Sequence, residues 1–83
     1  MARYVLYLPA MTHVDVINKW DSLSEFAEDL GVPYGTAKAM RRRGSIPPEY
    51  WLVVVKKATD RALVGVTLEV LAAAVAQKAE VAA

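Results

Sequence analysis

The sequence predicts an all-α protein in which five short helices form one small domain. Three observations lead to this prediction. The 83 residues leave room for a single hydrophobic core. Apolar residues after position 10 recur at spacings of three and four, and residues that start or stop helices bound each of these stretches. We therefore expect a helical domain over residues 11–83, preceded by a separate extension over residues 1–10.

The first expected helix runs from a Thr12 cap to about Trp20. Asp15 stands at the third helical position, where its carboxylate can complete a capping box with Thr12. The residues expected on the buried side are Val14, Ile17 and Trp20. His13 falls in the first turn, where we expect it at the surface with no role as a catalyst or ligand.

The second expected helix begins after Ser22 and ends before Gly31. Ser22 and Glu25 form the S-x-x-E pattern of a capping box. Gly31 can adopt the left-handed conformation that ends a helix at little steric cost. The expected inner stripe consists of Leu23, Phe26, Ala27 and Leu30.

Proline and glycine mark the bounds of the next two helices. Pro33 suits the start of a third helix because its missing N–H is not needed there, and Gly44 stops that helix after Arg43. Pro47 and Pro48 begin a fourth helix, with Trp51, Val54, Val55 and Ala58 expected inside. Its solvent side is expected to carry Lys56, Lys57 and Arg61.

The ends of the chain are less regular. Thr67 can cap a fifth helix, with Leu68, Leu71, Ala72 and Val75 expected inside. The apolar run in that region is shorter than the ~20 residues that span a bilayer, so no membrane segment is predicted. Residues 3–8 are rich in β-branched and aromatic residues, which favours either a short strand in need of a partner or a loosely packed extension.

Charge is distributed unevenly, although the formal net charge is only +1. Residues 11–32 hold one lysine and five acidic residues, a balance of −4. Residues 33–61 hold seven basic and two acidic residues, a balance of +5. An acidic segment followed by a basic one is typical of a protein with an anion-binding face. The alternative is an arginine-rich face that is merely solvated.

Composition also limits the chemistry that the chain can perform. The sequence has no cysteine and one histidine, which excludes disulfides, thiolate metal sites and histidine-cluster metal sites. The lack of cysteine suits a reducing cytoplasm. We expect no cofactor and no enzymatic activity.

The residues around Gly31 have the spacing of two helices that meet across a tight turn. Ala27 lies four positions before Gly31, and its small side chain lets the second helix approach the first. Val32 can fill the angle between the helices, while Ala37 and Met40 pack the third helix onto the core. This spacing of alanine and glycine is common in helical hairpins. It is more informative here because the helix after the turn is also the basic one.

The segment LSEFAEDLGVPYGTAKAMRR, residues 23–42, resembles the helix-turn-helix of the lambda-repressor-like and Cro-like DNA-binding domains of phages and bacteria. The following RRGSIPPEYW resembles small prophage-type regulators, in which an R-G-x-I-P turn and a tryptophan follow the recognition helix. The resemblance covers about residues 12–76 and leaves residues 1–10 unexplained. It departs from the family pattern at Ala37, where a branched residue is commoner, and at Gly35, early in the recognition helix.

The resemblance implies a sequence-specific transcriptional regulator, a phage- or prophage-type repressor, whose helix over residues 33–43 reads the major groove. Pro33, Tyr34 and Gly35 would then lie nearest the bases. Lys38 and Arg42 would follow on the same face and could bind guanine. For Tyr34, a role as a partly exposed packing residue is the alternative. Gly35 would either let the backbone approach the DNA closely or leave the helix to form fully on binding.

The resemblance implies phosphate contacts at both ends of the motif. Ser22 and Ser24, at the start of the preceding helix, would meet a phosphate through hydroxyl and backbone N–H groups. Arg41 and Arg43 would hold phosphates, and Thr36 could contact either a base or a phosphate.

The expected partner is double-stranded DNA, bound by a homodimer on a palindromic site, because one module reads few base pairs. RNA polymerase or another regulator is a further expected partner. The candidate dimer surfaces are the segment Tyr4–Leu8 and the outer side of the last helix around Val70, Ala74 and Val81. Two other functions fit the sequence: a helical interaction module of antitoxin or adaptor type, and a nucleoid-type protein that binds DNA without sequence preference.

Overall fold

A computed structural model describes residues 11–82, with side chains through Gln77. Over this range the chain is all-α and contains no β-strand. The elements in order are α1 (His13–Ile17), α2 (Leu23–Leu30), α3 (Tyr34–Arg43), the 3₁₀ turn η2 (Pro48–Tyr50), α4 (Trp51–Asp60) and α5 (Leu68–Ala82). The predicted fold of five helices is confirmed. The strand or dimerisation segment expected in residues 1–10 lies outside the described residues.

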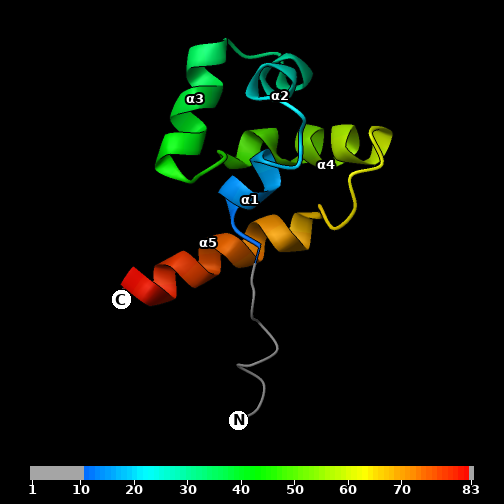
Figure 1. Ribbon diagram of the computed structural model, residues 1–83. Coiled ribbons are helices and arrows are strands. Elements are labelled where there is room, and N and C mark those ends of the chain that lie inside the picture. Colours follow the sequence, from blue (N-terminus) through cyan, green and yellow to red (C-terminus); the bar gives the residue numbers. More distant parts are fainter. Residues whose placement is uncertain (1–10, 83) are drawn as a thin grey trace.

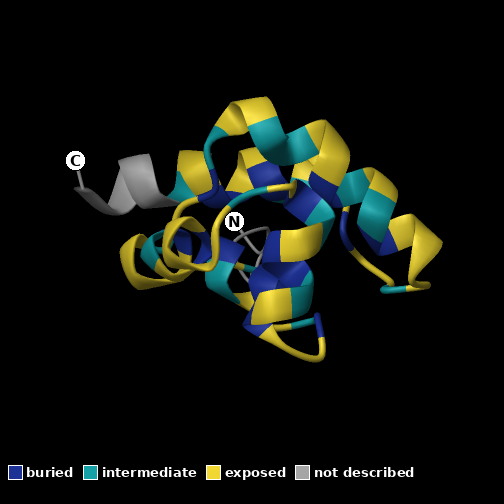
Figure 2. Cartoon of the chain, turned by 90° about the horizontal axis from the view of Figure 1, so that it is seen from above, coloured by how far each residue is buried: buried dark blue, intermediate teal, exposed yellow. Residues whose placement is uncertain are grey.

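Helix α4 is the central element, because it contacts both α2 and α5. Figure 1 shows α2 and α3 together above α4, with α5 below it. Helix α1 packs against α3, and buried residues line the inner sides of the helices (Figure 2). Fourteen residues form one core cluster: Val16, Ile17, Trp20, Leu23, Phe26, Ala27, Leu30, Ala37, Met40, Ile46, Val54, Ala58, Val66 and Leu71.

The predicted caps are present at the N-termini of three helices. Thr12 and Asp15 form a complete capping box on α1, although the helix ends at Ile17 rather than at Trp20. The hydroxyl oxygen of Ser22 accepts a hydrogen bond from the Glu25 N–H at 3.1 Å. Helix α5 is capped in the same way by Thr67, which accepts from the Val70 N–H. Local hydrogen bonding by Ser and Thr therefore sets where these helices begin.

Helices α2, α3 and α4 end on residues with positive φ. Gly31 and Gly44 have φ values of 71° and 70°. After α4 the corresponding position is Ala62, with φ of 59°, and the Leu63 N–H bonds back to the Ala58 carbonyl at 2.8 Å. This hydrogen bond closes the helix end as a glycine cap would, but with a residue that has a Cβ.

The buried face of α5 differs from the prediction. Leu71 and Ala74 are buried and Val70 is partly buried. Leu68, Ala72 and Val75 are exposed. The predicted inner stripe was therefore correct only at Leu71, and the predicted outer surface at Val70 and Ala74 was wrong. The Val81 side chain lies outside the described residues. Because this helix is apolar on every side, spacing alone did not identify the side that packs on the core.

Candidate nucleic-acid interface

The turn between α2 and α3 brings these two helices together. Gly31 ends α2 in the left-handed conformation, and the Val32 N–H bonds to the Ala27 carbonyl at 3.0 Å. Ala27 is buried, with 3% of its surface exposed, and Val32 packs against the core. Pro33 then takes an extended conformation at the residue before the first turn of α3. The predicted roles of these residues in a tight helical turn are confirmed.

One side of helix α3 faces the core. Ala37 and Met40 are buried, Ala39 is partly buried, and the other residues of the helix are exposed. At about 100° per residue, Gly35, Lys38 and Arg42 point away from that buried side. These three residues are called the outer stripe of α3.

Two flanks border the outer stripe. Tyr34 and Arg41 are seven residues apart, almost two helical turns, and therefore lie on one flank. Thr36 and Arg43 have the same spacing and lie on the other flank. Arg42 has this spacing from Gly35 on the outer stripe. Each of the three arginines therefore lies seven residues after an exposed residue of the first turn, on the same side of the helix. Tyr34 has 51% of its surface exposed, which agrees both with a base contact and with the alternative of a partly exposed packing residue.

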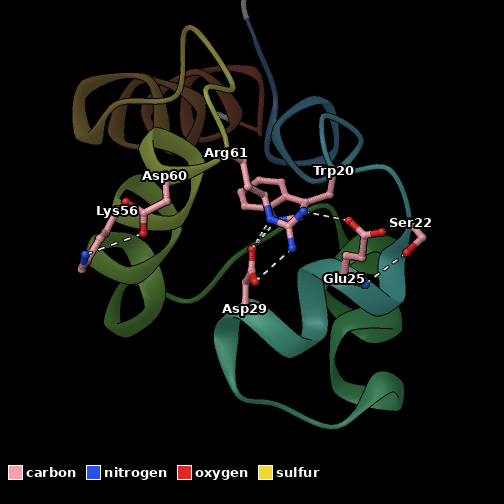
Figure 3. A network of polar contacts seen from close by, with 7 residues as sticks. All are labelled: Trp20, Ser22, Glu25, Asp29, Lys56, Asp60 and Arg61. Carbon is pink, nitrogen blue, oxygen red and sulfur yellow. Dashed lines mark hydrogen bonds and ion pairs between the residues drawn. The ribbon is translucent and has the colours of Figure 1, made fainter.

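The cations of α3 have no acidic partner among the side chains described through Gln77. Two cations elsewhere in the described part of the chain form ion pairs. Lys56 pairs with Asp60 at 3.7 Å on the surface of α4. Arg61 pairs with Glu25 at 2.8 Å and with Asp29 at 2.6 Å (Figure 3). Lys19 and Lys57 form no ion pair with a described side chain either, but they lie apart in the sequence, whereas α3 carries four cations without an acidic partner.

The Arg61 cluster connects the end of α4 to α2. The Arg61 guanidinium donates to both oxygens of Asp29 and to Glu25, and Trp20 Nε1 donates to Asp29 at 2.8 Å. Arg61 holds the pKa of the Asp29 carboxyl below its ordinary value, and the Trp20 hydrogen bond acts in the same direction. Glu25 was expected to complete a capping box, but its carboxylate binds Arg61 instead.

His13 contradicts its predicted place at the surface. It is buried, with 2% of its surface exposed. Its Nδ1 accepts the Ile46 N–H at 2.8 Å, and its Nε2 donates to the Leu71 carbonyl at 2.9 Å. Trp51, half-buried, donates from Nε1 to the Ile46 carbonyl at 2.8 Å. The turn that follows α3 is therefore fixed through both polar backbone groups of Ile46.

Ser22 and Ser24 are exposed at the start of α2, as a phosphate contact requires. The Ser22 oxygen accepts the Glu25 N–H, and its O–H can still donate to a phosphate oxygen, which only accepts. The N–H groups of the first helical turn have no intrahelical acceptor and point toward the same end of α2.

Two other kinds of feature are absent from the part of the chain that the structure describes. No three His, Cys, Asp or Glu residues in that part gather as a metal site would require. No helix there has the length and apolar character of a membrane span. Comparisons with protein-family models, curated proteins and solved structures found no match.

Proposed function

We propose that the protein is a sequence-specific DNA-binding regulator of the lambda-repressor-like kind, with α3 as its recognition helix. One observation supports this most strongly. The exposed helix after a tight turn carries Lys38, Arg41, Arg42 and Arg43, and no acidic side chain among the described residues neutralises them. A rigid, convex and cationic helix suits the major groove of DNA.

The outer stripe and its flanks support a division of labour within α3. Lys38 and Arg42 share the outer stripe with Gly35, so both side chains can reach base edges. Arg41 and Arg43 lie on opposite flanks, from which each can reach a phosphate strand. The exposed Ser22 and Ser24 hydroxyls offer a further phosphate contact.

The proposal includes a homodimer that acts on a palindromic site in the bacterial cytoplasm, as a repressor of phage or prophage type. Exposed Leu68, Ala72 and Val75 form the apolar outer side of α5 and replace Val70 and Ala74 as the candidate surface there. The segment Tyr4–Leu8 stays the other candidate. Sedimentation of the full chain, alone and with DNA, measures the stoichiometry. A monomer under both conditions contradicts the dimer.

Retention of genomic DNA fragments at several salt concentrations, with competitor DNA, tests the function. We expect a few fragments to be retained after competitor removes the rest. Equal retention of all fragments would indicate a nucleoid-type protein. No retention even at low salt would contradict DNA binding and favour a module that meets an acidic protein.

A further inference from the structure

Gly35 differs from the other glycines of the chain. Gly31, Gly44 and Gly65 have φ of 71°, 70° and 88°, a conformation in which a side chain is strained. Gly35 lies in the first turn of α3 and is not among the residues with positive φ. The local backbone therefore gives no reason for glycine at this position.

Packing gives no reason either. Beyond its two chain neighbours and the nearby backbone of its own helix, a Cβ placed on Gly35 meets no atom within 4 Å. By contrast, a Cβ on Gly65 would contact Met11 Cε at 3.4 Å. Since alanine is a much better helix former than glycine, a methyl group at position 35 should make the free protein more stable. Any benefit of glycine at this position would then come from contact with another molecule.

The position of Gly35 indicates where that benefit lies. It shares the outer stripe with Lys38 and Arg42, which follow three and seven residues later. The stripe therefore has bare backbone in its first turn and long cationic side chains beyond it. The N-terminal turn of such a helix can come into close contact with another molecule, while the cationic side chains extend beyond that contact.

We propose that Gly35 is a specificity-determining residue, at which the backbone of α3 makes its closest approach to the base edges. This inference rests on the proposed function. A methyl group at position 35 would hold the helix away from the floor of the groove. Lys38 and Arg42 would then lose the short, directional hydrogen bonds that distinguish bases. Flexible side chains on phosphates tolerate such a shift better, so binding to unrelated DNA should change little.

The test compares Gly35→Ala with Ala62→Gly. Each substitution should raise the melting temperature by about 4–8 °C, the first by improving helix propensity and the second by relieving the positive φ of Ala62. Only the first changes the outer stripe of α3. The probes are the duplex that the parent protein enriches from a random pool and a scrambled duplex of the same composition.

We expect Gly35→Ala to bind the enriched duplex at least about tenfold more weakly than the parent does. Its affinity for the scrambled duplex should stay within about threefold of the parent's. Ala62→Gly should match the parent on both duplexes. Unchanged binding of Gly35→Ala to the enriched duplex overturns the inference. So does an equal loss on both duplexes, which would place Gly35 against a phosphate strand. A parent protein that retains no DNA contradicts the proposed function instead, and this inference falls with it.

Discussion

The imidazole of His13 accepts a hydrogen bond from the backbone N–H of Ile46, 33 residues further along the chain, at 2.8 Å. Because a backbone N–H can only donate and the Leu71 carbonyl can only accept, the ring must carry its proton on Nε2. The ring also packs perpendicular to that of Trp51, with ring centroids 5.8 Å apart. One side chain in α1 thus joins α5 to the turn that ends the proposed recognition helix.

Replacing His13 with alanine should lower the free energy of unfolding by about 3 kcal/mol or more, because two buried backbone groups lose their partner at ~1–3 kcal/mol each. Urea unfolding followed by circular dichroism measures the loss. Asn18→Ala, an exposed position next to the same helix, is the control. A His13→Ala protein as stable as this control, or ring ¹⁵N shifts that place the proton on Nδ1, would contradict the assigned hydrogen bonds.

The Asp29–Arg61 pair should make stability depend on pH. Arg61 lowers the pKa of Asp29 in the folded state, so the pair contributes stability above the ordinary aspartate pKa of about 3.9. That contribution is lost as the pH falls through the lowered folded-state pKa. Arg61→Gln should therefore be less stable than the parent at pH 6, and the difference should shrink below about pH 4. Unfolding curves from pH 2 to 7 measure it, with Lys56→Gln as a surface-pair control. A difference that does not change with pH would contradict the assignment.

Ala62→Gly should raise the free energy of unfolding by about 1 kcal/mol, because glycine adopts the positive φ of this helix end without a Cβ penalty. Ala73→Gly is the matched control: the same substitution at an exposed position inside α5 should lower stability by ~1 kcal/mol. Thermal unfolding of both variants gives the comparison. Losses of equal size at the two positions would show that residue 62 does not have a left-handed conformation.

Arg41→Ala and Arg43→Ala should weaken DNA binding similarly on all sequences. Each removed phosphate contact should reduce the slope of log K against log salt by about 0.9. Affinities measured by fluorescence anisotropy at four salt concentrations give the slope. Lys56→Ala, which removes a cation already paired with Asp60, is the control. If the slopes of both arginine variants equal that of the parent, their side chains are solvated and do not bind phosphates.

Much of the local structure could be predicted from the sequence, because its signals are short-range. Ser22 and Thr67 fix helix starts through bonds to residues three positions later. Gly31 and Gly44 end helices because only glycine adopts their conformation at little cost. Once the bounds of α3 are known, helical spacing also predicts that its candidate DNA-binding residues are exposed. Their role in DNA binding stays a prediction.

The errors arose where long-range contacts or uniform composition decide the structure. His13 looked like a surface residue because its partners, Ile46 and Leu71, lie 33 and 58 residues away. The predicted exposure of Arg61 is correct, but its ion pairs were not predicted, because its acidic partners lie 32 and 36 positions earlier. In α5 the apolar residues surround the whole helix, so only tertiary packing selects Leu71 and not Leu68.

The central claim, that the outer stripe of α3 reads DNA sequence, is tested most directly by selecting preferred sites from a random duplex pool. The parent, Lys38→Ala and Arg42→Ala should be compared, with Lys56→Ala as the control. We predict that the parent and the control enrich the same site, and that each stripe variant loses preference at its own base pair, with affinity lower by about 1–3 kcal/mol. Enrichment of one unchanged site by all four proteins, or of no site by the parent, would contradict the claim.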